Sequence, residues 1–200
     1  MSYQLKIDIQ SYWHPGTGSG RGSDVDAVTH RDKDDLPCLP GKSLKGILRD
    51  AVSRWEQFTQ ANTSPPSLAN KLFGAGADDG DTWLGLVRVS DAVLADDIRY
   101  YLIKSAKDEG GKNSLIPSLY RSIHATAIEH ETGTAVNKSL RGMEVVIPLT
   151  LYATLDEVPN AEHKIPNWHK TIEQSLNLIQ AVGAHRSRGL GRAVVTLEDK

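Results

Sequence analysis

Aspartates gather in an irregular stretch near the start of the chain, and their carboxylates are the first candidates for chemistry. The stretch follows a glycine run at 16–22 and contains Asp24, Asp26, Asp32, Asp34 and Asp35. A carboxylate can hold a hydrated Mg²⁺ ion, and it can also act as a general base. Taken alone, an aspartate in a loop more often bonds its own backbone, so the neighbouring elements must support a chemical role.

The same aspartates could instead form a calcium or magnesium site of their own. Their spacing does not match an EF-hand, because no glycine follows them in register and no glutamate closes the loop. Tight metal binding in the absence of nucleic acid would support this alternative.

A basic amphipathic helix is predicted to follow the aspartates, from Ser43 to about Gln60. Its apolar residues recur at helical spacing, at Leu44, Ile47, Leu48, Ala51, Val52 and Trp55. Lys42, Lys45 and Arg49 lie off this stripe, and Ser43 can cap the first turn. Unpaired N–H groups, the positive end of the helix dipole and two lysines favour phosphate there, although a solvated cationic face is the alternative for any soluble helix.

The residues Gly41-Lys42-Ser43 look like the end of a phosphate-binding P-loop. That motif needs a glycine five positions earlier, where this chain has Leu36. Pro37 and Pro40 would also stiffen a loop that must wrap phosphates with its N–H groups. The sequence therefore argues against nucleotide hydrolysis.

A second candidate for anion binding lies near the C-terminus, at 183–192. It contains three arginines and no acidic residue. The candidate anion-binding residues are His185, Arg186, Arg188, Gly189, Gly191 and Arg192. Arginine forks suit phosphate, and glycine lets the backbone approach a ligand closely. A helix cap followed by a solvated turn is the alternative, but a cap needs one glycine and no arginine, so anion binding is favoured.

Composition sets the remaining limits. The chain has 200 residues, a net charge of −2 and 39% hydrophobic residues, which suits one folded, rather polar domain over 1–200. Overall charge gives no drive toward nucleic acid, so any such surface must come from local clusters. The single Cys38 excludes an internal disulfide and a cysteine zinc site. No signal peptide or membrane-spanning apolar run is visible, so we expect a cytoplasmic protein without membrane contact.

The predicted elements run β-α-β and then β-α-β, an α+β, ferredoxin-like (RRM-like) split βαβ plan. Strands are expected at 3–9, 83–89, 144–154 and 193–197, and helices at 43–60 and 168–182, where Gly183 is the expected cap. Loops inserted at about 61–82 and 95–118 interrupt this core, and the second was expected to be an insertion or a mobile arm. A protruding hairpin is expected at about 119–142, pairing 121–129 with 134–141 around a turn at Gly133.

These segments together resemble the RAMP superfamily of CRISPR-associated proteins, especially the repeated backbone subunits of type III effector complexes. The resemblance lies in a loop aspartate (Asp26), then Arg31-Asp32, then the run from Leu36-Pro37 through Pro40-Gly41 to Leu44-Lys45-Gly46 and Arg49. The hairpin region, with 126–135 and 140–146, resembles that family's thumb. The loop at 183–192 resembles its C-terminal glycine-rich loop.

The resemblance implies a subunit that polymerises along a guide RNA and whose thumb interrupts the guide–target duplex. It also implies that Asp26 supports cleavage of target RNA with Mg²⁺ or another divalent metal, and Asp24 is a second candidate ligand. Partners would be guide RNA, target RNA and other CRISPR effector subunits, including like subunits in a filament. The residues expected to contact RNA are Arg31, Lys42, Ser43, Lys45, Arg49, His185, Arg186, Arg188, Gly189, Gly191 and Arg192.

Two further functions stay open on the sequence. The chain could be a structural subunit that binds RNA without cleaving it. It could also be a stand-alone RNase that processes precursor guide RNA by general acid–base catalysis, which commonly uses histidine. No histidine lies on the first predicted helix, and His30, between Asp26 and Arg31, is the nearest candidate for proton transfer.

Overall fold

A four-stranded antiparallel sheet forms the centre of the protein. The computed structural model describes residues 2–18, 26–59, 67–75, 84–107 and 114–199. The strands are β1 (Ser2–Ile9), β2 (Val87–Val89), β5 (Leu149–Glu157) and β6 (Ala193–Asp199). Their order in the sheet is β2-β5-β1-β6, which is the order of a ferredoxin-like fold, so the predicted fold class is confirmed.

The central strand β1 follows directly from its alternating sequence. Leu5, Ile7 and Ile9 are buried, while the polar residues between them are partly exposed. β1 pairs along its length with β5 on one side and with β6 on the other, so that Leu5 lies opposite Ala153 and Leu197. A shift of one residue would turn the apolar set toward solvent, so the alternation also fixes the register.

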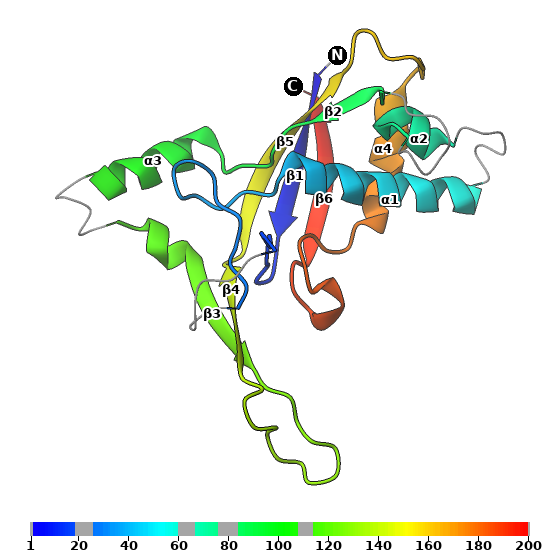
Figure 1. Ribbon diagram of the computed structural model, residues 1–200. Helices are drawn as coiled ribbons and strands as arrows, with labels where there is room; N and C mark the ends of the chain where they lie inside the picture. The colour runs from blue at the N-terminus through cyan, green and yellow to red at the C-terminus, as the bar shows by residue number, and fades with distance from the viewer. Residues whose placement is uncertain (1, 19–25, 60–66, 76–83, 108–113, 200) are drawn as a thin grey trace.

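Helices α1 (Gly41–Thr59) and α4 (Trp168–Ser175) pack together on the sheet (Figure 1). The predicted stripe of α1 is the buried face, where Leu44, Leu48 and Val52 enter the core. The short helix α2 (Leu68–Phe73) packs beside α1 and lies within the predicted insertion at 61–82. Glu56 of α1 accepts the Leu68 N–H of α2 at 2.9 Å, which joins the two helices.

Both helix boundaries differ from the prediction. α1 begins two residues before Ser43, which is therefore not its cap, because Pro40 ends the preceding segment and supplies the first accepting carbonyl, to Leu44 N–H at 3.0 Å. α4 ends at Ser175 and tightens into the 3₁₀ turn η4 (Leu176–Leu178). The buried Ser175 hydroxyl bonds the Ile172 carbonyl, a contact that competes with continuation of the helix.

The predicted hairpin is present as a separate two-stranded sheet that projects from the body (Figure 1). It is formed by β3 (Tyr120–Ala125) and β4 (Arg141–Val146), with Ala125 opposite Arg141, so residues 126–140 form the tip. The predicted pairing of 121–129 with 134–141 is present next to the turn, where Ile128 bridges Ala135, whereas β3 pairs with β4, which begins at the end of the predicted second strand. Gly133 does lie in the tip turn, with φ of 67° and its N–H bonded to the Glu129 carbonyl.

One predicted strand is divided in two. The apolar run at 144–154 supplies the end of β4 and the start of β5, and Pro148 lies between them. Proline has no N–H to donate to a ladder, so the chain leaves the hairpin there and enters the central sheet. The hairpin is thus continuous in sequence with the core strand β5.

The described parts of the inserted segment predicted at 95–118 contain helical structure. It consists of helix α3 (Asp96–Lys107) and the 3₁₀ turn η3 (Ile116–Leu119). The strand predicted at 83–89 is limited to β2, because Leu86 N–H bonds the Lys71 carbonyl at the end of α2, and Trp83 lies outside the described residues. Within the described ranges, no helix has the length and apolar character needed to cross a membrane.

Candidate functional site

A pocket of about 550 Å³ joins four segments of the chain, three of them from 14–47 and the fourth from 183–186. It is lined by His14, Pro15, Gly16, Gly18, Asp26, Ala27, Leu39, Pro40, Ser43, Ile47, Gly183, Ala184, His185 and Arg186. Asp26, Ser43, His185 and Arg186 were all predicted from the sequence as functional residues. The fold therefore brings the candidate catalytic carboxylate to the same pocket as the start of α1 and the loop at 183–192, which we call the arginine–glycine loop.

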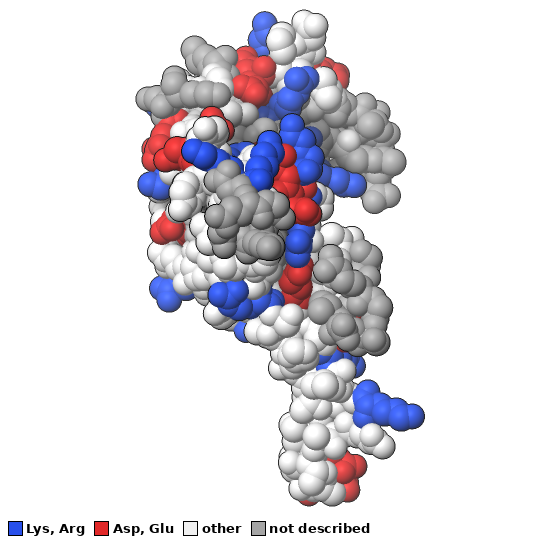
Figure 2. Space-filling view, turned by 90° about the vertical axis from the view of Figure 1, so that its left-hand side faces the viewer, with Lys and Arg blue, Asp and Glu red and all other residues white. Residues whose placement is uncertain are grey.

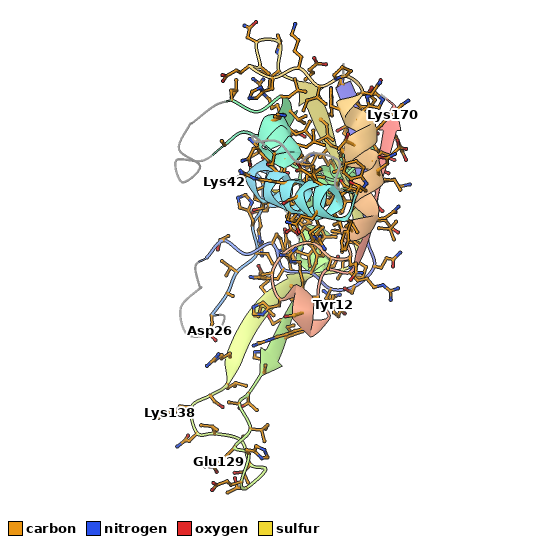
Figure 3. The ribbon with its side chains drawn as sticks, turned by 90° about the vertical axis from the view of Figure 1, so that its right-hand side faces the viewer. Tyr12, Asp26, Lys42, Glu129, Lys138 and Lys170 are labelled. Carbon is orange, nitrogen blue, oxygen red and sulfur yellow. The ribbon has the colours of Figure 1, made fainter. Side chains whose placement is uncertain are left out.

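Asp26 lies at the root of the hairpin, where two reciprocal hydrogen bonds hold it. Its backbone N–H donates to the Gly142 carbonyl at 2.8 Å, and its Oδ2 accepts the Gly142 N–H at 2.9 Å. The side chain is otherwise exposed, and no hydrogen bond joins Oδ1 to another described residue. Figure 3 shows Asp26 next to the hairpin and below α1. The carboxylate is thus oriented through one oxygen and available through the other.

The donor set at this pocket fits only a metal ion that keeps most of its water. Within the described ranges, no three His, Cys, Asp or Glu side chains lie close enough together to bind one ion. Asp24, the second candidate ligand, lies outside the described residues. Mg²⁺ is commonly held by one or two carboxylates and retains several waters, so Asp26 alone satisfies the minimum.

Glu144 of β4 is the centre of a second cluster, beside the pocket. Its Oε1 accepts the Arg31 guanidinium at 2.7 Å, and its Oε2 accepts the Thr29 backbone N–H at 3.1 Å and the Thr29 hydroxyl. The Arg31 guanidinium also stacks on Tyr120, 3.8 Å from the ring centre. Burial acts to raise the pKa of Glu144, but the Thr29 hydrogen bonds and the Arg31 charge outweigh it and hold this pKa below its ordinary value.

This cluster changes the interpretation of Arg31, which we predicted to contact RNA. Its guanidinium is already paired with Glu144 and stacked on Tyr120, and the Tyr120 hydroxyl donates to the Asp35 carbonyl. Arg31 therefore joins the aspartate-rich loop to both strands of the hairpin. A contact between Arg31 and RNA stays a prediction.

His14 is a pocket residue that the sequence did not identify. It is buried, and its Nδ1 lies 2.7 Å from the Glu144 carbonyl. A carbonyl can only accept, so Nδ1 carries the hydrogen of this contact. Its ring lies 6.3 Å from that of His185 across the pocket. His30, the histidine that we considered for proton transfer, instead contacts Cys38 at 3.3 Å and does not line the pocket.

A second carboxylate cluster ties α3 to the aspartate-rich loop. Arg99 of α3 bonds Asp32 at 2.5 Å and Asp34 at 2.9 Å. Burial acts to raise the pKa of Asp32, but the Arg99 hydrogen bond and the Leu36 and Asp34 N–H groups lower it below its ordinary value. Two of the five aspartates are thus occupied in holding the loop, which leaves Asp26 as the described aspartate in the pocket.

The lowered pKa values of Asp32 and Glu144 predict a loss of stability in acid. A carboxyl group whose pKa is lower in the folded state stabilises the protein above its unfolded value, and this stability is lost as the pH falls through the folded value. We expect the free energy of unfolding to be steady from about pH 7 to pH 5 and to fall below about pH 4. Urea unfolding at several pH values measures it, and the Asp32→Asn, Glu144→Gln double variant should show a weaker dependence. An equal dependence in the double variant would contradict the assignment.

The N-terminus of α1 is less open to phosphate than the sequence predicted. The Gly41 N–H donates to the Asp91 carboxylate at 2.7 Å, and a Cβ on Gly41 would lie 2.7 Å from the Val89 carbonyl. A carboxylate of the protein itself therefore occupies the positive end of the helix dipole. Ser43, two residues further along α1, still lines the pocket.

The cations of α1 do not line the pocket. Arg49 hydrogen-bonds Asn70 of α2, and Lys45 is partly buried. Burial and the neighbouring Arg49 charge lower the pKa of Lys45. Figure 3 shows Lys42 at the end of α1, on the far side of the aspartate loop from the hairpin. RNA contacts by these three residues remain predictions.

A groove of about 820 Å³ lies between α1, η4 and β6. Its polar lining includes Arg54, Arg186 and Arg192, together with Asp50 and Gln10. Ile47 and Arg186 line both the groove and the pocket, so the two hollows meet at the arginine–glycine loop. Arg54 is a second residue that the sequence analysis missed.

The arginine–glycine loop depends on glycine at two tight positions. A Cβ on Gly191 would lie 1.8 Å from the Val182 carbonyl oxygen, and one on Gly183 would lie 2.7 Å from that of His14. Both residues have positive φ, at 74° and 81°. Gly183 is therefore not the predicted helix cap, because it lies several residues after η4 and packs against His14. The 3₁₀ turn η5 (Arg186–Arg188) lies between these glycines.

The charge on the face that carries α3 is mixed. Figure 2 views this face and shows basic and acidic side chains interspersed on the body and a mostly uncharged hairpin below it. The described part of this face offers no uniform basic surface. The pocket and the groove are better candidates for phosphate binding, because arginines from separate elements line them.

Comparison with known proteins agrees with this architecture. The sequence profile of the RAMP superfamily matches residues 6–194. Two solved structures of a type III-B Cmr-β complex, one in the apo state and one bound to cognate target RNA, each contain a chain with the same fold. Each has a TM-score of 0.70 and 13% sequence identity, and the alignment covers 98% of this chain and 97% of that one. No curated protein sequence matches. The family resemblance seen in the sequence is confirmed, and the chain belongs to the RAMP superfamily.

Proposed function

We propose that this chain is a subunit of a CRISPR effector complex that binds guide RNA and, with a divalent metal, cleaves complementary target RNA through Asp26. One observation carries the proposal: the pocket joins Asp26 to Ser43, His185 and Arg186, a carboxylate beside groups suited to phosphate. Similar folds in a Cmr-β complex bound to cognate target RNA support a role beside RNA and other effector subunits. The test is cleavage of guide-complementary RNA by the assembled complex, with wild-type chain against Asp26→Ala.

The reaction needs little covalent chemistry from the protein. Attack of the 2′-hydroxyl forms a P–O2′ bond and breaks the P–O5′ bond of the same phosphate, so the nucleophile comes with the substrate. In this proposal Asp26 Oδ1 accepts the 2′-hydroxyl proton, while Oδ2 keeps its hydrogen bond from Gly142. The departing 5′-oxygen takes a proton from water. A bound Mg²⁺ would supply charge stabilisation at the phosphate. Arg186, His185 and the Ser43 hydroxyl line the pocket and can donate hydrogen bonds to phosphate oxygens.

Guide RNA is assigned to the surface where the pocket meets the groove. Arg186 belongs to both hollows, and Arg54 and Arg192 extend the basic lining along α1 and β6. Phosphates recur along an RNA strand, so separated arginines on one path can contact successive phosphates. Recognition of sequence is left to base pairing between guide and target.

The arginines of the loop should control the salt dependence of RNA binding. Replacing Arg186, Arg188 and Arg192 by glutamine removes three cations, and each phosphate contact contributes about 0.7 to the slope of log affinity against log salt for a single strand. We expect the slope to become shallower by about 2. Titration of a labelled guide RNA at several salt concentrations measures it.

The matched control is Lys170→Gln, an exposed cation on α4 that Figure 3 places at the opposite end of the molecule from Asp26. Its slope should equal that of the wild type. An unchanged slope in the triple variant would place the phosphate contacts elsewhere, with Lys42, Lys45 and Arg49 as the next candidates.

A structural subunit that binds RNA without cleaving it is the second candidate. The hydrogen bond from Gly142 to Asp26 gives this aspartate a purely structural reason to be present, since it anchors the hairpin root. The lack of a larger metal-binding cluster within the described ranges is compatible with this role. Normal RNA binding by wild type without metal-dependent cuts would select this candidate.

A further inference from the structure

Tyr12 is an aromatic residue held rigidly at the edge of the arginine–glycine loop. It lies just after β1, where its carbonyl accepts the Gly191 N–H at 2.7 Å. The preceding Ser11 hydroxyl accepts the Arg192 N–H at 2.9 Å and donates to the Gly189 carbonyl at 3.3 Å. Three hydrogen bonds thus fix this short segment against the loop.

The side chain of Tyr12 faces outward from this fixed backbone. Its neighbour Trp13 is fully buried, whereas Tyr12 is 43% exposed. Successive side chains of an extended segment point to opposite sides, which explains the contrast. Figure 3 shows Tyr12 beside η5, the turn that carries Arg186 and Arg188.

The surroundings of Tyr12 are basic. Arg186, Arg188 and Arg192 are exposed, and none of them forms an ion pair with another described residue. An exposed aromatic ring among unpaired arginines is the combination found in surfaces that bind single-stranded nucleic acid, where the cations hold phosphates and the ring stacks on a base. Neither the core nor the loop requires an aromatic side chain here, since all the hydrogen bonds of this segment use backbone groups and Ser11.

We propose that Tyr12 stacks on a nucleobase of the RNA strand whose phosphates the arginine–glycine loop binds. The inference rests on the proposed function, because it concerns the same RNA. Stacking on a base adds affinity that does not depend on charge. Because every base has a flat aromatic face, this contact tolerates any RNA sequence. The rigid backbone means that little conformational entropy is lost when the base binds.

The test compares the full-length variants Tyr12→Ala and Tyr12→Phe in binding a labelled single-stranded RNA. Loss of one stacked base should weaken binding by about 5- to 100-fold in Tyr12→Ala. Tyr12→Phe should bind like wild type, because the ring is kept. The salt slope should be the same in all three proteins, since no charge changes.

The control is Tyr100→Ala, which removes a tyrosine of α3 that is more exposed than Tyr12, at 68% against 43%, and lies away from the loop. It should have no effect on RNA binding.

An abasic RNA separates stacking from a general loss of structure. Wild type should bind the abasic strand less tightly than the normal strand, whereas Tyr12→Ala should bind both equally. Equal affinity of wild type and Tyr12→Ala for normal RNA would overturn the stacking contact and leave the proposed function intact. A loss in Tyr12→Ala that persists in full on abasic RNA would also overturn it. A wild-type chain that binds no RNA would overturn both proposals.

Discussion

Replacing Asp26 by alanine is expected to abolish the metal-dependent cuts in target RNA while binding of the target is kept. The carboxylate is the only described acidic side chain that lines the pocket, and its loss removes both the candidate base and the candidate metal ligand. Loss of a positioned acid–base group lowers rates by about 100- to 10,000-fold. The measurement is the single-turnover cleavage rate of guide-complementary RNA by the assembled complex in Mg²⁺.

Asparagine at the same position is the matched control for structure. Its side-chain oxygen can still accept the Gly142 N–H, so the hairpin root should keep its hydrogen bond. Its amide carries no charge and is a poor base. Asp26→Asn should therefore fold and bind like wild type and yet cleave as poorly as Asp26→Ala.

Two results would contradict the catalytic assignment of Asp26. If Asp26→Asn cleaved at the wild-type rate, the residue would only anchor the hairpin, as in the second candidate function. If cuts survived in both variants, the catalytic group would be Asp24 or a residue of a neighbouring subunit. In either case the binding measurements would show whether the RNA surface itself is intact.

Replacing Glu144 by alanine is expected to destabilise the protein by about 3 kcal/mol, because it leaves the half-buried Arg31 charge and the Thr29 N–H without their partner. The side chains of Arg31 and Glu144 are 24% and 12% exposed, so water replaces the lost contacts poorly. For a chain of this size, that loss lowers Tm by about 6–12 °C. Thermal unfolding followed by circular dichroism measures it.

A double-mutant cycle isolates the Arg31–Glu144 pair from the rest of the cluster. Arg31→Met keeps much of the apolar stem and removes the charge, so it should relieve part of the penalty of Glu144→Ala. Additive effects of the two substitutions would show that the pair contributes little. Glu144→Gln, which keeps an acceptor for Thr29, should be milder than Glu144→Ala.

Local patterns in the sequence were enough to predict the central elements. Alternation at Leu5, Ile7 and Ile9 and the apolar stripe that includes Leu44 and Leu48 each determine which face is buried, and burial determines the layers. The order of these elements then gave the ferredoxin-like plan. The roles of Asp26 and Arg186 were predicted separately from the sequence, and the structure then places both residues in one pocket.

The remaining features depend on contacts between distant residues. Asp91 caps α1 from fifty positions further along the chain, and nothing near Gly41 indicates it. Glu144 did carry a signal, because an acidic residue in an apolar run must find a partner, but the partner could not be named. Pro148 was a visible break in the run at 144–154, and local proline rules could have placed the end of β4.

The hydrogen bonds between Asp26 and Gly142 fix the position of the carboxylate relative to the hairpin. In the proposed function, Asp26 and the hairpin would act on different points of an RNA duplex. The hairpin extends from the residues that hold the carboxylate, so the root of the hairpin and Asp26 are joined directly. In the proposed function, the hairpin marks a position on the duplex and Asp26 acts at a constant distance from it. The cutting position would then be set by where each hairpin inserts into the duplex. Recognition of the bases at the cut would not be required.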